Sequence, residues 1–344
     1  MPEKPSMLGP IAIHDKLIRL LPFATTLANP NCVAIEIERA RGPPGSGGTS
    51  CADYSFSINC ERIHVNSPIA YFGGKSRLAN KFIPLFPEHT RYVEVFGGGG
   101  SILFAKPLST IEIYNDLDSA LFDFFSVLAS PTQFRKFKRL VEAQPFCRKL
   151  HVHCFNTWAR EKLLVNRVAK WYIAMRQGFS GRLSESWGYS VSNGRNGQSQ
   201  GVSKWIGGIA RLPEIHARLQ GVQIDNRDFR KIVWAYDKPD TFFYMDPPYV
   251  PDTRRNGEYR YEMSVEDHEE LVELLLTVQG SVMLSGYDTE LYRPLEKAGW
   301  VREEFDVTCS AAARTRSSGL QGKGSCKEKQ KRTEVIWMNY SLGN

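Results

Sequence analysis

Apolar runs of strand length recur along the chain from residue 66 onward, separated by segments of helical periodicity. The expected strands are RYVEVF (91–96), IEIYN (111–115), VQIDN (222–226), TFFYM (241–245), SVMLS (281–285), VREEFDV (301–307) and TEVIWMNY (333–340). Helices are expected to open near Ser76, to cover 118–130 and about 289–298, and to follow Ser264, with Asp267 in capping-box position. Strands that alternate with helices predict an α/β fold with a mostly parallel, doubly wound sheet.

This alternation lapses between residues 131 and 221, where the sequence is basic, aromatic and of helical character and ends in a loop rich in Gly, Ser and Asn. Between Cys147 and Trp205, ten Lys and Arg residues stand against two acidic ones, an excess greater than the net charge of +7 of the whole chain. Aromatic residues are interleaved with these charges: Trp158, Trp171, Phe179, Trp187, Tyr189 and Trp205. The composition favours an inserted domain that contacts nucleic acid over the alternative, a helix with a solvated basic face.

Residues 1–65 show little periodicity and include the low-complexity stretch RGPPGSGGTS (41–50), so we expect a poorly ordered N-terminal extension. Two explanations stay open: a genuine part of the protein, or a start site assigned too far upstream. The chain lacks a secretory signal pattern and any apolar run of membrane-spanning length. Seven scattered cysteines without a CxxC pair fit a reducing compartment, so we expect a cytoplasmic protein without membrane contact.

One cluster has the residue types of a zinc site, namely Cys147, His151, His153 and Cys154. Its spacing matches no standard zinc finger, which favours ordinary, partly buried side chains. We therefore expect no metal.

The segment VEVFGGGGS (93–101) is a strand that runs into a glycine turn. Such a turn removes side chains, so that backbone amides and the following helix N-terminus can approach a bound nucleotide. No spacing in it completes GxGxxG, which disfavours a nicotinamide or flavin cofactor. About twenty residues on, Asp116 follows the next strand and places a carboxylate where a ribose diol would lie. The alternative is a helix cap at Asp116 or Asp118.

The most specific motif is Asp246-Pro247-Pro248-Tyr249, directly after the strand TFFYM. Two prolines fix the backbone, so the Asp246 carboxylate and the Pro247 carbonyl can each accept an N–H bond from a planar amine. Two such acceptors would favour a pyramidal nitrogen that can attack a methyl group. Tyr249 would stack on a base that has left the duplex. The alternative is a plain proline turn after a core strand.

Taken in order, the motifs resemble the DNA adenine methylase family over about residues 66–340. The motifs are AYFGGKSRL (70–78), VEVFGGGGS (93–101), YNDLD (114–118), DNRDF (225–229), YMDPPY (244–249), LSGYDTELY (284–292) and TEVIWMN (333–339). The resemblance implies a class I, Rossmann-like methyltransferase fold with a seven-stranded sheet and an antiparallel last strand. It also implies a catalytic domain in two parts, 66–130 and 222–344, around a small helical target-recognition insertion at 131–221.

The resemblance further implies which residues act. It assigns the catalytic role to Asp246, Pro247, Pro248 and Tyr249. It assigns contacts with the cofactor S-adenosyl-L-methionine to Tyr71, Lys75, Glu94, Phe96, Gly97, Gly98, Gly99, Asp116, Asp228, Phe229 and Asp246. In the insertion, WYIAMRQGFSGR (171–182) is similar to the segment before the family's recognition elements, where Arg176 and Arg182 would meet DNA phosphates or base edges. The family often has Pro where this chain has Val95, and residues 1–65 match nothing in it.

The expected function is site-specific methylation of the exocyclic 6-amino group of a flipped adenine in double-stranded DNA. A methyltransferase of RNA adenine or protein glutamine, or a catalytically silent DNA-binding protein, are the alternatives. Asp rather than Asn at position 246, and an insertion between the motifs, favour DNA adenine. The sequence leaves open the recognition site and a cognate restriction endonuclease as a further partner.

Overall fold

The computed structural model describes residues 36–39, 54–57, 65–71, 73–181, 183–190, 197–250, 260–308 and 331–342. The chain divides into two compact units, residues 1–63 and 64–344. In the first unit, β1 (Glu36–Arg39) pairs antiparallel with β2 (Tyr54–Ser57). The expected poor order of the remaining N-terminal extension concerns residues that lie outside the described ranges.

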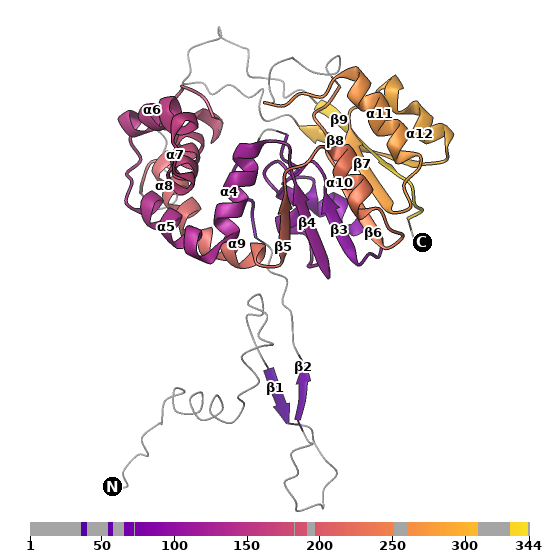
Figure 1. Cartoon of the computed structure of the whole chain (residues 1–344), viewed down its shortest axis with the longest axis horizontal. Helices are drawn as coiled ribbons and strands as arrows, with labels where there is room; N and C mark the ends of the chain where they lie inside the picture. The colour runs from indigo at the N-terminus through magenta and orange to yellow at the C-terminus, as the bar shows by residue number, and fades with distance from the viewer. Residues whose placement is uncertain are drawn as a thin grey trace, which may run out of the picture. The chain divides into compact units, whose positions relative to one another are not determined.

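The second unit is built on a seven-stranded sheet (Figure 1). Its strands are β3 (Arg91–Glu94), β4 (Ile111–Asn115), β5 (Val222–Asp225), β6 (Thr241–Met245), β7 (Ser281–Gly286), β8 (Val301–Thr308) and β9 (Lys331–Met338). They lie in the order β5-β4-β3-β6-β7-β9-β8, and β9 runs antiparallel to both of its neighbours, β7 and β8. The predicted mostly parallel sheet with an antiparallel last strand is confirmed.

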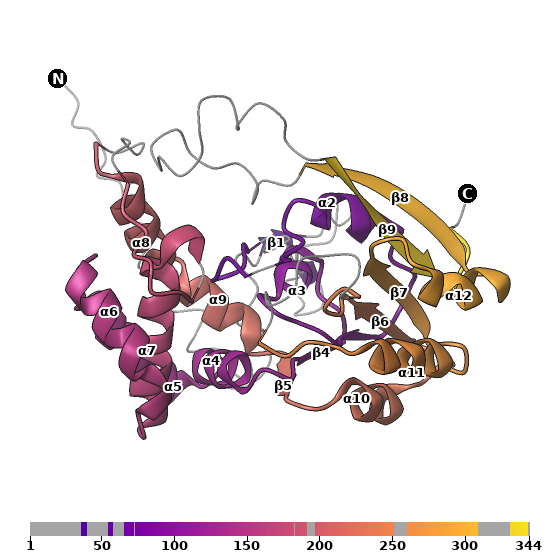
Figure 2. The same ribbon diagram turned by 90° about the horizontal axis from the view of Figure 1, so that it is seen from above.

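Helices cover both faces of this sheet (Figure 2). The covering helices are α2 (Ala79–Phe82), η2 (Ile83–Leu85), α3 (Ser101–Ala105), α4 (Ser119–Ala129), α10 (Phe229–Tyr236), α11 (Val265–Leu275), η6 (Glu290–Tyr292) and α12 (Arg293–Lys297). Strand alternation divides them: Ile113 packs into the core under α10 to α12, whereas the next residue, Tyr114, packs against Phe125 of α4. The doubly wound arrangement therefore follows from strands that are apolar on both faces.

A run of helices stands between α4 and β5, where the alternation lapses in the sequence. They are α5 (Pro131–Glu142), α6 (Arg148–Thr157), η3 (Trp158–Arg160), α7 (Leu164–Gln177), η4 (Phe179–Gly181), α8 (Gln200–Ala210) and α9 (Leu212–Leu219). They gather beside the sheet edge that ends in β5 (Figures 1 and 2). Trp171 and Trp205 are buried among them, whereas Phe179 and Tyr189 are exposed. Some of the aromatic residues of this segment, such as these two tryptophans, therefore pack between helices and do not form an exposed surface.

Some element boundaries differ from the expected ones. The helix expected near Ser76 begins at Ala79, because residues 76–78 form a turn and Leu78 offers no side-chain cap. The strand that was expected to continue to residue 96 ends at Glu94, where the chain turns into the glycine loop. The capping box at the start of α11 is confirmed: Ser264 accepts from the Asp267 amide, and Asp267 accepts from the Ser264 amide. Within the described ranges, no helix combines the length and apolar character needed to span a membrane.

Candidate active site

A pocket opens at the carboxyl edge of β3, β4 and β6 and encloses about 1000 Å³, counting its open mouth. It is lined by all the residues predicted to contact the cofactor, together with Pro248: Tyr71, Lys75, Glu94, Phe96, Gly97, Gly98, Gly99, Asp116, Asp228, Phe229 and Asp246. Residues from segments as distant as 71 and 246 therefore share one cavity, as expected for strands whose carboxyl ends meet at one edge.

The glycine loop requires its glycines. Gly98 has a φ of 50°, in the left-handed region that favours glycine. A Cβ at Gly97 would lie 2.2 Å from the Tyr114 ring, and one at Gly98 would lie 3.1 Å from the Tyr71 ring. Tyr114 also donates a hydrogen bond of 2.7 Å from its hydroxyl to the Gly98 carbonyl. The loop therefore packs directly against both aromatic rings, which leaves no room for side chains at Gly97 and Gly98.

Asp116 lies on the pocket wall and is held by the backbone. Its carboxylate accepts from the amides of Gly98 (2.7 Å) and Asp118 (2.8 Å). Burial raises its pKa to about 6, although both amide bonds act in the opposite direction. The cap of α4 is Asp118, which accepts from the Ala120 amide at 2.9 Å. Of the two alternatives, the cap therefore belongs to Asp118, and Asp116 faces the pocket.

Two aromatic rings form an apolar part of the wall. The rings of Phe96 and Phe229 lie with centroids 5.8 Å apart. Asp228 precedes Phe229 and caps α10 by accepting from the Arg230 amide at 2.9 Å. Asn115 fixes this region because its side-chain amide donates to the carbonyls of Val95 and Arg227, at 2.8 and 3.0 Å.

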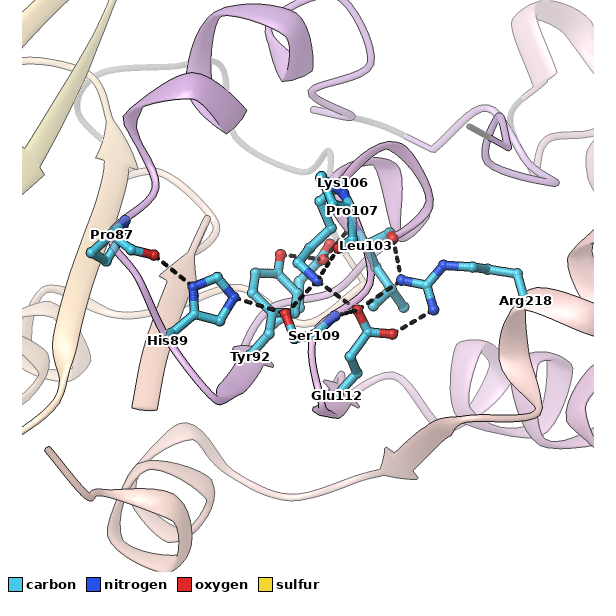
Figure 3. A network of polar contacts seen from close by, with 10 residues as sticks. Pro87, His89, Tyr92, Leu103, Lys106, Pro107, Ser109, Glu112 and Arg218 are labelled. Atoms are coloured by element: carbon cyan, nitrogen blue, oxygen red, sulfur yellow. Dashed lines mark hydrogen bonds and ion pairs between the residues drawn. The ribbon is translucent and has the colours of Figure 1, made fainter. Parts of the chain in front are cut away.

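Glu94 is a buried carboxyl group on the same wall. It accepts from the Tyr92 hydroxyl at 2.7 Å and from the Leu103 amide at 2.8 Å. Burial raises its pKa to about 8 in spite of these two donors. Behind it lies a buried ion network in which Arg218 of α9 binds Glu112 of β4 and donates to the Leu103 carbonyl at 2.8 Å (Figure 3). These contacts bind α9, the last helix of the inserted segment, to the sheet next to the pocket.

The DPPY turn begins where β6 ends. Lys75 approaches both carboxylate oxygens of Asp246, at 2.6 and 2.8 Å, and the Ser285 hydroxyl donates to Oδ1 at 3.0 Å. Lys75 also donates to the Tyr249 hydroxyl at 2.6 Å. The Tyr249 ring is buried and stands edge-on to Tyr287, with centroids 4.4 Å apart. Lys75, predicted from its motif as a cofactor contact, thus also joins the two ends of the DPPY motif.

Sequence reasoning missed two residues of this cluster, Ser285 and Glu334. Glu334 of β9 accepts from the Tyr249 hydroxyl and forms an ion pair with Lys75 at 3.3 Å. It is buried, with 4% of its surface exposed. For Glu334, the only signal in the sequence is a carboxylate inside the run TEVIWMN, whose pattern predicts a strand and no site residue.

Arg176, one of the two residues predicted to contact DNA, is not among the residues that line the pocket. Arg176 of α7 donates to the Lys204 carbonyl of α8 at 2.7 Å, so its guanidinium group joins two helices. Arg182 lies outside the described residues. Arg148 stacks over the Trp187 ring at 4.9 Å, close to the exposed Tyr189. Aromatic and cationic side chains therefore share a surface in this part of the chain.

The suspected zinc cluster has two of its members, His151 and Cys154, buried on α6. Across the described part of the chain, no group of three or more His, Cys, Asp or Glu side chains is arranged to hold a metal ion. Burial raises the pKa of the Cys154 thiol to about 11, which disfavours the thiolate that zinc would need.

Comparison with known proteins shows which family has the sequence segments that line this pocket. The family model described as D12 class N6 adenine-specific DNA methyltransferase matches residues 71–304. The type II methyltransferase M1.LlaDCHI of Lactococcus lactis subsp. cremoris is 26% identical over 294 residues, which cover 81% of this chain and 97% of that protein. The modification methylase StsI of Streptococcus sanguinis is 20% identical over 204 residues, which cover 57% of this chain and 30% of that protein.

The family match spans about two thirds of the chain and contains the GGK segment, the glycine loop, Asp116 and the DPPY turn. These are the segments that the fold brings together around the pocket. The family resemblance and the adenine-specific function predicted from the motifs are confirmed: the chain belongs to the D12 class of N6 adenine-specific DNA methyltransferases.

Proposed function

We propose that the protein transfers a methyl group from S-adenosyl-L-methionine to the exocyclic 6-amino group of an adenine flipped out of double-stranded DNA. The main observation behind this proposal is that Asp246 lines the same pocket as the glycine loop and Asp116. An acceptor for an amine therefore lies in the same pocket as the glycine loop and the Asp116 carboxylate, and the two parts of a methyl transfer share one site.

The residues present fit this cofactor. The glycine loop lines the pocket with backbone, because Cβ atoms at Gly97 and Gly98 would not fit against the Tyr114 and Tyr71 rings, and the Asp116 carboxylate is an acceptor for ribose hydroxyls. Phe96 and Phe229 offer aromatic faces for the adenine ring of the cofactor, and Glu94 is a carboxyl group suited to its amino group. When bound, the cofactor supplies an electrophilic methyl group on a sulfonium sulfur.

Asp246 holds the target amine. A carboxylate has about four acceptor positions, and Lys75 and Ser285 occupy two on Oδ1 and one on Oδ2. Counting contacts from the described residues, Oδ2 retains a position for one N–H of the adenine amine, and the Pro247 carbonyl accepts the other. This arrangement draws the nitrogen lone pair out of the ring and orients it for attack. Tyr249 follows in the turn and stacks on the flipped base.

Residues 131–221 serve as the target-recognition insertion in this proposal, between the catalytic parts 66–130 and 222–344. Support comes from the basic excess of the segment and from the exposed rings of Phe179 and Tyr189. Arg176 and Arg182 contact phosphates or base edges. A cognate restriction endonuclease, the remaining predicted partner, would cleave the unmethylated form of the same DNA site.

The test is methyl transfer by the purified full chain. Plasmid DNA grown without adenine methylation is incubated with tritium-labelled S-adenosyl-L-methionine, and the modified positions are mapped by long-read sequencing. We expect label in DNA and N6-methyladenine at one recurring sequence. An RNA substrate of the same sequence serves as the control. Label confined to RNA or to protein, or methylation of cytosine, would contradict the proposal.

A further inference from the structure

The direction of β9 brings a second carboxylate to the DPPY turn. Because β9 runs antiparallel to β7, its first residues reach the edge of the sheet where the parallel strands end. Val335 pairs with Gly286, the last residue of β7, so Glu334 lies just beyond the end of that strand. Val335 and Trp337 face the core under α10 to α12, so alternation turns Glu334 to the opposite face, toward Lys75.

Stability alone does not explain a carboxylate at this position. Glu334 is almost fully buried, and burial raises its pKa. A buried ion pair contributes little net stability compared with well-packed apolar side chains of similar size. Lys75 already has Asp246 as a partner at 2.6 Å, so Glu334 is not needed to neutralise it. A second carboxylate on the same ammonium group therefore points to a role in the chemistry of the turn.

We propose that Glu334 is a positioning residue for methyl transfer: it holds Lys75 and Tyr249 in place and leaves the cluster around Asp246 with net negative charge. The inference rests on the proposed roles of Asp246 and Tyr249. Two carboxylates against one ammonium group give a net charge of one negative unit, counted from Asp246, Glu334 and Lys75.

That charge matters when the amine reacts. As the nitrogen bonds to the methyl carbon, the bond from that carbon to sulfur breaks and the nitrogen becomes cationic. It stays so until one of its two protons passes to Asp246 and from there to water. A site that is net negative before the reaction stabilises this developing cation without reorganising. Without Glu334, Lys75 would balance Asp246 alone, and the cluster would be neutral at the moment when positive charge appears.

Glu334 also fixes the ring that contacts the base. The Tyr249 hydroxyl donates to Glu334 and accepts from Lys75, so both of its hydrogen-bonding directions are in use. Together with the edge-on contact to Tyr287, these bonds restrict the rotation of the ring. The orientation of Tyr249 toward a flipped base thus depends on a residue 85 positions away in sequence.

The variant Glu334→Gln tests the inference in the full chain, because it keeps the size of the side chain and removes its charge. Glu303→Gln is the matched control, since Glu303 is exposed on the neighbouring strand β8 and carries the same charge. For each protein, we would measure the single-turnover rate of adenine methylation, the dissociation constants of S-adenosyl-L-methionine and DNA, and the fluorescence of 2-aminopurine placed at the target position.

We expect Glu334→Gln to slow methyl transfer about tenfold to a hundredfold, the loss typical of a hydrogen bond to a charged group. Both dissociation constants should stay within about twofold of the wild type. Loss of a whole binding interaction of about 1.4 kcal/mol would change them about tenfold. Glu303→Gln should behave as the wild type. In combination with Tyr249→Phe, the loss should be smaller than the product of the two single losses, because both act through one hydrogen bond.

A wild-type rate in Glu334→Gln, a loss that appears only in the dissociation constants, or independent effects of the two substitutions would each overturn the inference. If Glu334→Gln melts early, Glu334→Asp replaces it. Its shorter side chain keeps the charge but not the reach, so the inference requires a rate between those of the wild type and Asp246→Ala. A wild-type protein that methylates no adenine would instead refute the proposed function itself.

Discussion

Asp246→Ala distinguishes a catalytic DPPY turn from a proline turn that only ends a strand. The variant removes the carboxylate that accepts from Lys75 and Ser285 and that is proposed to hold the amine. Losing one preorganised hydrogen-bonding group at a reacting centre costs about 100-fold to 1000-fold in rate, and a misoriented amine adds to this. The expected single-turnover rate is therefore at least about 100-fold below that of the wild type.

The fold should survive this change. Removing one partner of a buried ion pair costs about 3–5 kcal/mol when the other charge is left alone. Here Lys75 keeps Glu334 at 3.3 Å and the Tyr249 hydroxyl at 2.6 Å, and the Asp246 side chain is 17% exposed. The expected loss is nearer to that of one charged hydrogen bond, about 1.5–3 kcal/mol.

Single-turnover methylation of a duplex that contains the recognition site measures the rate, and thermal melting followed by circular dichroism measures the stability. Ser285→Ala is the matched comparison, because it removes only one hydrogen bond to Oδ1 and leaves the carboxylate in place. Its rate should fall by about tenfold or less. Near-normal turnover by a well-folded Asp246→Ala protein would refute the catalytic role and leave the turn with a structural one.

Three further predictions concern the pocket and the insertion. Burial raises the pKa of Glu94 from 4.5 to about 8, so the free energy of unfolding should fall as pH rises through this window. Glu94→Gln should make that fall smaller in melts across these pH values, and the part that remains below about pH 6 is the contribution of Asp116, whose pKa is also raised. Asp116→Asn should weaken S-adenosyl-L-methionine binding in calorimetry about tenfold without changing DNA affinity, because it takes away a charged acceptor for the ribose; equal cofactor affinity would exclude that contact. Replacing Arg176 and Arg182 with Ala should weaken DNA binding and flatten its dependence on salt, because fewer counterions are released, while cofactor affinity stays constant; an unchanged salt slope would place the DNA surface elsewhere.

Local sequence patterns were sufficient to predict the strands and turns that carry this site. The central strands β3, β4, β6 and β7 are short runs of mostly buried residues, and the glycines after β3 and the prolines after β6 act on the backbone directly beside them. In a parallel sheet, the carboxyl ends of the strands meet at one edge. Asp116 and Asp246 could therefore be assigned to one pocket although 130 positions separate them. The motif order likewise indicated the family, because each motif is contiguous in sequence.

Other features depended on contacts between distant segments. Which interleaved aromatic residues are buried, as Trp171 and Trp205 are, is decided by helix packing, and the bond from Arg176 to the Lys204 carbonyl needs α7 and α8 side by side. Neither the burial of these tryptophans nor this hydrogen bond can be predicted from the local pattern of charge. A basic, aromatic segment therefore predicts a DNA surface without identifying which side chains reach it.

Sequence alone thus determined the family, the sheet and the residues at the ends of its parallel strands, because these depend on short-range patterns and on one rule of topology. Tertiary structure decided which side chains surround Asp246. Lys75 lies 171 positions away in sequence, and Glu334 lies near this site only because β9 runs antiparallel between β7 and β8. Strand order is a long-range property, since it is set by which apolar faces can be buried together and not by the residues of one strand.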